Sequence, residues 1–327
     1  MNLTRRLTLY TLAMLMVSTQ LSAQTNADAY PTKPVRVVIP FVAGGGGDNQ
    51  ARLILGRVSQ ELGQPFVFEN VAGAGGNVGA QAVTRANPDG YTLLYGTNGT
   101  HGINHALYKN PGFNPRKDFE AVGRLSSIPA MLVVRPGLTA NNVSELITLL
   151  KSKQGGYTFA SAGNGTTSHL TGEMFKAQTG VDAVHVPYKG GAPAMVDLIA
   201  GRIDFMIDVI PNTAPQVRGD RIKALAVTSA QRLGSFPNLP TMIESGLENF
   251  QVTAWDAVFA PAGTPAAVVE KINAAINKAL ADPELRKQLA SRGSEVYPSS
   301  SAELSRFIGT EMERWGQAVK RAGASLE

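Results

Sequence analysis

Short apolar runs alternate with amphipathic stretches along most of the chain. A short apolar run bounded by turn residues predicts a strand, and apolar residues three or four positions apart predict a helix. The expected strands are 35–40, 66–69, 91–95, 131–134, 157–160, 203–207, 222–228 and 252–260. The expected helices are 48–62, one ending at 86, 144–151, 191–200, 266–280, 284–291 and one after Ser300. This alternation predicts an α/β protein with a mostly parallel sheet and helices on both faces.

The length of 327 residues suggests about two domains. No low-complexity linker separates them, so we expect the chain to cross between domains within strands, near 127–133 and again near 251–255. Two crossings make the first domain discontinuous, with the C-terminal helices returning to it. The predicted division is 30–128 with 254–327 for domain 1, and 129–253 for domain 2.

The first 23 residues have the pattern of a secretory signal peptide. Arg5 and Arg6 precede an apolar run at 7–17, and a polar stretch then ends in small residues at Ala23. The apolar run is too short for a bilayer, which needs ~20 residues. Cleavage after Ala23 or after Ala29 fits the pattern, and we expect a soluble protein after cleavage.

Composition narrows the class of protein further. The chain has no cysteine, which excludes thiol catalysis, thiolate metal sites and a lipid-modified N-terminal cysteine. A secreted protein without a lipid anchor stays near the cell only in an enclosed compartment, which indicates the periplasm. The net charge is +5, but lysine and arginine are spread along the chain without a basic block. We therefore expect a monomer that attracts small anions mildly and binds no nucleic acid.

Two glycine-rich segments each follow an expected strand and precede a helix. The first glycine loop is 41–48, with the sequence FVAGGGGD, and the second glycine loop is 161–168, with the sequence SAGNGTTS. Glycine lets the main chain approach a ligand closely, and the first turn of a helix presents unpaired N–H groups and a positive dipole end. Together these features predict an anion pocket built from the backbone, although each loop alone is also compatible with a plain turn.

Further polar residues follow other strand ends, where ligands bind in open α/β sheets. Asn98 follows the strand 91–95, Tyr188 lies where a strand turns into a helix, and Asp208 ends the strand at 203–207. His169 directly follows the second glycine loop, and we expect it to support that loop through a ring N–H. The predicted ligand-binding residues are Phe41, Ala43, Gly44, Gly45, Asp48, Asn98, Ser161, Ala162, Gly163, Asn164, Thr166, Thr167, His169, Tyr188 and Asp208.

Templates for catalysis and cofactor binding are not matched. The sequence has no G-x-x-x-x-G-K-[ST] loop, no G-x-S-x-G elbow and no H-E-x-x-H motif, and 73–79 is interpreted as a structural turn. His101 and His105 stand four apart without an evident third metal ligand, and Asp204 with Asp208 lacks an assignable partner acid. We expect no cofactor, no metal and no enzymatic activity. A secreted hydrolase is the alternative, and it would require a nucleophile–base pair.

An ordered set of motifs resembles the Bug family, the receptors of tripartite tricarboxylate transporters. The segments that carry the resemblance are 39–48, 160–165, 186–190, 225–229, Pro240-Thr241 with Glu244 and Gly246, and 260–265. No single motif is decisive, but the set occurs in order from about residue 30 to the C-terminus.

The resemblance implies a type II periplasmic-binding-protein fold, with two doubly wound domains and a ligand cleft between them. It implies that two loops, matching 41–48 and 161–168, hold a ligand carboxylate through main-chain N–H groups and ordered water. The expected function is to capture a small carboxylate, a di- or tricarboxylate or an aromatic acid, for a transporter's membrane subunits. A ligand-sensing subunit of a signalling system is the alternative. One departure is the run Gly44–Gly47, where serine or threonine is expected, and it is expected to widen the pocket or remove a hydroxyl contact.

Overall fold

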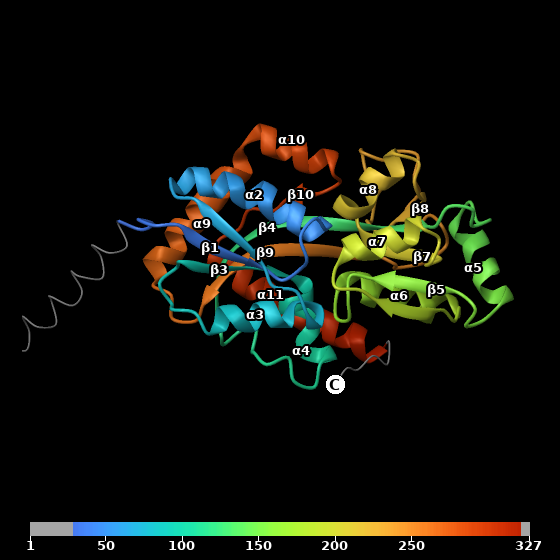
Figure 1. Ribbon diagram of the computed structural model, residues 1–327, viewed down its shortest axis with the longest axis horizontal. Helices are drawn as coiled ribbons and strands as arrows, with labels where there is room; N and C mark the ends of the chain where they lie inside the picture. Colours follow the sequence, from blue (N-terminus) through green and yellow to red (C-terminus); the bar gives the residue numbers. More distant parts are fainter. Residues whose placement is uncertain (1–28, 322–327) are drawn as a thin grey trace, which may run out of the picture.

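The computed structural model describes residues 29–321, and the expected signal peptide therefore lies outside the described residues. The described chain forms a sheet with helices on both faces (Figure 1), which confirms the α/β prediction. The strands are β1 (Val35–Ile39), β2 (Phe66–Asn70), β3 (Thr92–Thr97), β4 (Phe119–Val134), β5 (Thr158–Ser161), β6 (Val184–Pro187), β7 (Phe205–Val209), β8 (Lys223–Val227), β9 (Thr253–Pro261) and β10 (Glu295–Val296).

The helices agree with the sequence pattern except at two places. The helices are α2 (Gly46–Leu62), α3 (Asn77–Thr84), α4 (Asn104–Leu107), α5 (Val143–Ser152), α6 (Thr167–Thr179), α7 (Gly191–Ile199), α8 (Ile210–Arg218), α9 (Ala266–Ala281), α10 (Pro283–Ser291), α11 (Ser301–Arg321), the 3₁₀ turn η1 (Ala74–Gly76) and the π-helix η2 (Gly99–Ile103). The pattern did not predict α8, which contains Pro215, or η2 with α4, where Gly102 weakens a helical signal. It also did not predict the first part of β4.

The sheet consists of two parallel parts joined by an antiparallel centre. Its order is β2-β1-β3-β9-β4-β7-β5-β6, with β8 and β10 pairing only with β4. The first half is built on β1, β2 and β3, which run parallel, and the second half on β5, β6 and β7, which also run parallel. Between them β9 is antiparallel to β3 and β4. The prediction of a parallel sheet thus holds within each half and fails at the centre.

The two central strands carry the chain from one half to the other. In Figure 1, β4 and β9 run along the length of the molecule. The residues of β4 from Phe119 to Pro129 pair with β9, and those from Ala130 to Val134 pair with β7 and β8. The change of partner falls beside the domain boundary expected at 128/129. The division into two domains at these strands stays a prediction.

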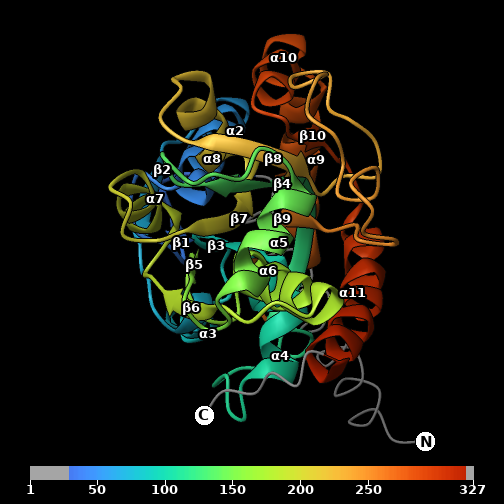
Figure 2. The ribbon, with the colours of Figure 1, turned by 90° about the vertical axis from the view of Figure 1, so that its right-hand side faces the viewer.

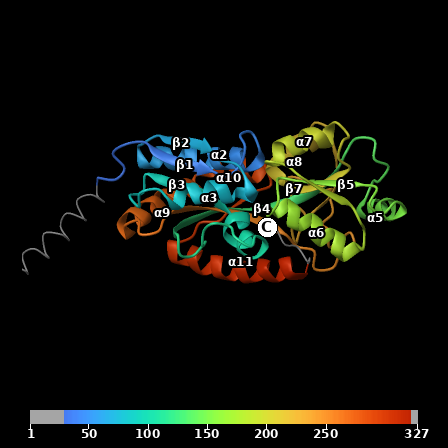
Figure 3. The same ribbon diagram turned by 60° about the horizontal axis from the view of Figure 1, so that its bottom comes forward.

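The C-terminal helices pack against elements from distant parts of the chain. Helix α9 shares a buried cluster with β1 and α2, through Ile272 and Ile276 among others. Helix α11 lies along the sheet near β4, as Figures 2 and 3 show. Near its end, Trp315 belongs to the same cluster as Phe175 of the second half. The C-terminal segment thus covers the first half and also touches the second.

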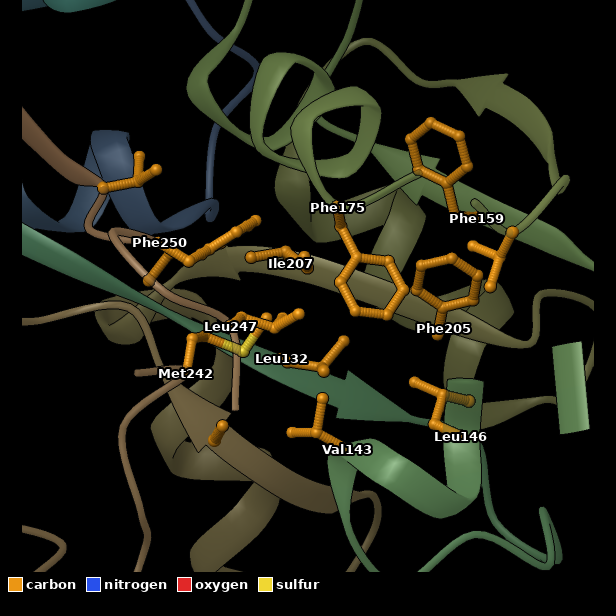
Figure 4. Packing of buried hydrophobic residues seen from close by; sticks show 14 of the residues in the cluster. Leu132, Val143, Leu146, Phe159, Phe175, Phe205, Ile207, Met242, Leu247 and Phe250 are labelled. Carbon is orange, nitrogen blue, oxygen red and sulfur yellow. The ribbon is translucent and has the colours of Figure 1, made fainter. Parts of the chain in front are cut away.

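The second half has an aromatic core. The rings of Phe159 and Phe205 are 5.7 Å apart between centroids, and those of Phe175 and Phe205 are 5.8 Å apart. Figure 4 shows these rings beside Leu132 on β4. This core fixes β5 and β7 side by side, so their carboxyl ends meet at one place. Within residues 29–321, no helix is long and apolar enough to cross a membrane.

Candidate functional site

A cavity lies between the halves where β1, β3, β5 and β7 end. About 690 Å³ of space that no atom fills lies there, a figure that includes space open to the solvent. Its walls come from Phe41, Val42, Gly45, Gly46, Gly47, Tyr95, Thr97, Asn98, Gly99, Ile128, Ala162, Thr166, Thr167, Ser168, Gly191, Asp208, Val209, Pro211, Ala254, Trp255 and Asp256. None of these residues is a lysine or an arginine.

Several helices begin at this cavity. The first residues of α2 (Gly46), α6 (Thr167), α7 (Gly191) and η2 (Gly99) all line it. The first N–H groups of a helix have no acceptor within the helix, and they carry the positive end of its dipole. No side chain caps α2 or α7, because glycine stands at both N-cap positions. The cavity therefore attracts negative charge although no cationic side chain lines it.

The first glycine loop is held from behind by a buried carboxylate. Asp48 Oδ2 accepts a hydrogen bond from the Gly44 N–H at 2.9 Å, and its Oδ1 accepts from Arg52 Nε and Asn70 Nδ2, also at 2.9 Å. Asn70 Nδ2 also donates to the Phe41 carbonyl at 2.9 Å. Asp48 does not line the cavity, so its contact with a ligand stays a prediction. It anchors the loop, because a buried carboxylate is stable only with several donors around it.

The glycines of the first loop allow a close approach between the halves. A Cβ on Gly46 would lie 3.1 Å from both Cβ and N of Asn212 on α8, and a Cβ on Gly47 would lie 3.1 Å from the Phe41 ring. Gly44 has φ +81°, a left-handed conformation that favours glycine. Because Gly46 has no side chain, α2 packs closely against α8. The glycine run was expected to widen the pocket or remove a hydroxyl contact, and at Gly46 it serves close packing instead.

The second glycine loop is held by hydroxyl groups. Ser168 Oγ accepts from the Ala162 N–H at 2.9 Å, and Ser161 Oγ accepts from the Gly163 N–H at 3.1 Å. Thr166 Oγ1 donates to the Gly163 carbonyl at 2.6 Å and caps α6 by accepting from the His169 N–H. The loop's own side chains therefore occupy several N–H groups that the sequence assigned to a ligand. In the first turn of α6 the His169 N–H is also taken, by Thr166, so the N–H groups of Thr167 and Ser168 are the ones left for a ligand there.

Two neutral imidazoles support the same loop. His169 Nδ1 accepts from the Gly165 N–H at 3.3 Å, and its ring stacks on His185 at 4.3 Å between centroids. Burial lowers the pKa of His169 to about 4, helped by Lys176, and lowers the pKa of His185 to about 3, helped by His169 and Lys176. His169 supports the loop as expected, but its ring nitrogen accepts where donation was predicted.

Ser161 and His185 form the kind of pair that a hydrolase would need. Ser161 Oγ lies 2.7 Å from His185 Nε2. The Ser161 side chain is fully buried and does not line the cavity, and its oxygen already accepts the Gly163 N–H. An attacking oxygen must reach its substrate, so this pair braces the second glycine loop.

The two halves are in direct contact around the cavity. Thr167 Oγ1 on α6 donates to Asn98 Oδ1 at 2.9 Å, and Tyr108 Oη, beyond α4, donates to the Asn164 carbonyl at 2.8 Å. A Cβ on Gly75 would lie 2.0 Å from the Asn164 carbonyl oxygen, so this position accepts glycine alone. The glycine-rich turn at 73–76 thus packs directly against the second glycine loop, and it also lines the adjoining cavity.

Two buried carboxyl groups also line the cavity. Asp208 accepts from Asn212 Nδ2 at 2.5 Å, and Asp256 on β9 accepts from Tyr95 Oη at 2.5 Å and from Ser126 Oγ at 2.6 Å. Burial raises the pKa of each carboxyl to about 6, against the opposing effect of these hydrogen bonds. Both carboxyl groups are therefore half protonated near pH 6 and become largely neutral only below it.

The structure divides the predicted site residues into three groups. The cavity wall includes Phe41, Gly45, Asn98, Ala162, Thr166, Thr167 and Asp208. An adjoining cavity, which shares Phe41 and Ala162 with the first, includes Gly163, Asn164 and Tyr188. The residues outside both walls are Ala43, Gly44, Asp48, Ser161 and His169. The sequence did not single out Tyr95, Trp255 or Asp256. Trp255 and Asp256 belong to β9, and only the sheet order reveals that β9 lies beside β3.

The other residues weighed for chemistry lie apart from the cavity. His101 is buried, stacks on Phe259 at 3.6 Å between centroids, and burial lowers its pKa to about 3. Asp204 pairs with Arg135 at 2.9 Å and does not face Asp208 across a site. Among residues 29–321, no group of three or more His, Cys, Asp or Glu side chains is placed to hold a metal ion.

Comparison with known proteins identifies the family. The family model "Tripartite tricarboxylate transporter family receptor" matches residues 50–324, and the chain belongs to this family. The chain is similar to the periplasmic binding protein BugD, with 38% identity and a TM-score of 0.88 over 91% of this chain and 100% of that one.

Two further solved structures contain a bound ligand. The Rhodopseudomonas palustris protein MatC, with bound malate, is 36% identical with a TM-score of 0.85, over 89% of this chain and 100% of MatC. The R. palustris protein Rpa4515, with adipate, is 36% identical with a TM-score of 0.89, over 91% of this chain and 100% of that one. The family and the type II periplasmic-binding fold implied by the sequence motifs are thereby confirmed.

Proposed function

We propose that this protein is a periplasmic receptor that captures a small carboxylate and delivers it to the membrane subunits of a tripartite tricarboxylate transporter. The observation that carries the proposal is the convergence of the first turns of α2, α6 and α7 on one cavity. Hydrogen bonds to a charged acceptor are roughly twice as strong as neutral ones. A few such bonds in a closed cavity hold a carboxylate without an arginine.

The proposed ligand class follows from the family and from the cavity walls. Relatives with 36% identity were solved with malate and adipate, both dicarboxylates. The wall also offers Tyr95 and Trp255, whose rings suit an apolar or aromatic ligand body. We therefore propose a di- or tricarboxylate or an aromatic acid, with one carboxylate at the helix N-termini.

Capture proceeds by closure of two domains. Domain 1 comprises 30–128 and 254–327, and domain 2 comprises 129–253, so that the crossings lie where β4 changes partner near Pro129 and where β9 begins at Thr253. Rotation about these two strands opens and closes the cavity between the halves. The contacts between Tyr108 and Asn164 belong to the closed form.

The remaining parts of the proposal concern place and partners. The signal pattern at 1–23 directs export, and the protein then works in the periplasm as a soluble monomer. The closed form is the state that the transporter's membrane subunits recognise. Neither a cofactor nor a catalytic step is needed, because binding and release complete the task.

The proposal is tested by isothermal titration calorimetry of the mature protein. The panel is malate, adipate, citrate, glutamate and benzoate, with the diamine putrescine as a control of opposite charge. We expect at least one carboxylate to bind with micromolar affinity, which corresponds to about 8 kcal/mol, and putrescine not to bind. Mass spectrometry of protein purified without refolding checks for a ligand brought from the host. Failure of every carboxylate, with none co-purified, would contradict the proposal.

A further inference from the structure

One hydrogen bond joins the two halves through side chains that both line the cavity. Asn98 follows β3 in the first half and is 1% exposed, and Thr167 begins α6 in the second half and is 7% exposed. Thr167 Oγ1 donates to Asn98 Oδ1 at 2.9 Å. This bond exists only when the halves are together, because its two partners belong to different halves.

The bond also fixes which way the Asn98 amide faces. With Oδ1 turned to Thr167, the Nδ2 group is directed elsewhere, and it is buried with no hydrogen-bond partner among the described residues. A buried amide donor without an acceptor destabilises the structure that buries it. The closed form of the free protein therefore carries an unfavourable group at the wall of its binding cavity.

Resting on the function proposed above, we propose that Asn98 couples ligand binding to closure. A ligand carboxylate oxygen accepts from Asn98 Nδ2, while Thr167 holds the amide from the opposite half. The same oxygen lies within the field of the N-termini of α2, α6 and α7, which line the cavity. Closure without ligand buries an unpaired donor, and closure with ligand pairs it, so the ligand shifts the equilibrium toward the closed form.

The proposed contact makes Asn98 the position that selects among ligands by charge. The Asn98 amide donates to an oxygen that has a free lone pair, and a carboxylate oxygen is the best acceptor because the bond is then charge-assisted. A ligand with an ammonium group at that point leaves the donor unpaired and adds repulsion from the helix N-termini. Asn98 is thus a specificity-determining residue for the anionic end of the ligand.

The test compares four variants, using the carboxylate of the panel that binds the wild-type protein most tightly. Asn98→Ala removes the donor, and we expect about 10-fold to 100-fold weaker binding. Asn98→Asp keeps an acceptor for Thr167 but replaces the donor by a negative charge, and we expect at least the same loss. Thr167→Val removes the bridging hydroxyl, and we expect a smaller loss, about 3-fold to 10-fold. Thr167→Ser retains the hydroxyl and is expected to restore most of the affinity.

Closure is measured separately from affinity, by small-angle X-ray scattering with and without ligand. We expect Thr167→Val to reduce the ligand-induced compaction and Thr167→Ser to retain it. Thr148→Val is the matched control, because Thr148 is exposed on α5 outside the cavity and donates only to the Ser144 carbonyl. Thermal melting of each variant separates loss of folding from loss of binding. Asn98→Ser is the replacement if the alanine variant does not fold, with the same expected loss.

Three results overturn the inference. Wild-type affinity in Asn98→Ala, or in Asn98→Ser in its place, shows that the amide contributes no contact. If Asn98→Asp binds the ligand as tightly as the wild-type protein, the atom of residue 98 that faces the ligand is an acceptor and not the proposed donor. Unchanged affinity and compaction in Thr167→Val show that the bridge does not act in closure. If the wild-type protein binds no carboxylate, the function proposed above fails first, and the variants then test nothing beyond it.

Discussion

The two glycine loops have similar sequences but are held in different ways. The first glycine loop is held by the carboxylate of Asp48, with Asn70 and Arg52 around it, all behind the loop. The second glycine loop is held by its own hydroxyls, Ser161 and Ser168 among them, which occupy its amide groups. The comparison teaches that glycine content does not by itself leave N–H groups free for a ligand. The neighbouring polar side chains decide which loop N–H groups stay free. The first turns of the helices supply further N–H groups for a ligand.

The largest expected effect is at the anchor of the first glycine loop. Asp48→Ala leaves the Gly44 N–H and the Asn70 amide unpaired in a buried place, and we expect about 3 kcal/mol lower stability. Urea unfolding followed by tryptophan fluorescence measures it. Asp48→Asn keeps one acceptor and is expected to lose less. Equal stability in wild type and Asp48→Ala would show that the loop holds without its anchor.

The matching change in the second glycine loop is Ser161→Ala. It removes the acceptor of the Gly163 N–H and the partner of His185, both uncharged, so we expect a smaller loss of about 1–2 kcal/mol. The same urea experiment measures it. A loss larger than that of Asp48→Ala would reverse the comparison between the two loops.

A third prediction concerns closure at the first glycine loop. Gly46→Ala places a Cβ 3.1 Å from Asn212 on α8, in the other half, and we expect about 10-fold weaker ligand binding, or about 1.4 kcal/mol. Calorimetric titration measures the affinity. Gly56→Ala, in the same helix with open space around it, is the control and is expected to keep the affinity and raise stability by about 0.5–1 kcal/mol. Equal affinity in both variants would show that the halves tolerate a side chain at Gly46.

The smallest expected effect concerns the acidic wall. Burial raises the pKa of Asp208 and Asp256 to about 6, so both are charged at pH 7.5 and repel an anionic ligand. As the pH falls through 6 they take up protons, and carboxylate affinity is expected to rise. Asp208→Asn removes one of the charges, so we expect roughly 3-fold tighter binding at pH 7.5 and a weaker pH dependence between 5.5 and 7.5.

Titration of this variant and of Asp256→Asn against the same carboxylate at each pH checks the acidic wall. The protonation of Asp208 and Asp256 also makes the stability of the fold depend on pH. The folded protein binds these protons more tightly than the unfolded chain, so the cost of the two buried charges grows as the pH rises from about 4 to about 6. If both variants keep the wild-type pH dependence of carboxylate affinity, the charges of Asp208 and Asp256 do not affect ligand binding.

Much of the fold could be predicted from local sequence because each half repeats strand, turn and helix. The strands β1, β5 and β7 and the helices α2 and α9 lie within a few residues of their predicted bounds. Helix α8 was missed because Pro211 and Pro215 argue against a helix, and here Pro211 occupies the first turn, where its missing N–H is not needed. The first part of the long strand β4 was missed, and its pairing with β9 is irregular, with register shifts between Ala121 and Gly123 and between Arg124 and Ser126.

The sequence by itself determined the class of fold, the family and the two strand ends at which glycine replaces side chains. These features are local, since a turn with φ +81° at Gly44 or a helix start after Gly45 depends on the adjacent residues. Only the tertiary structure decided that Asp48 anchors the first glycine loop, that Asp256 joins the wall and that Asn98 meets Thr167. These pairings depend on which strands become neighbours, and a buried polar group finds its partner only after the strands are in place.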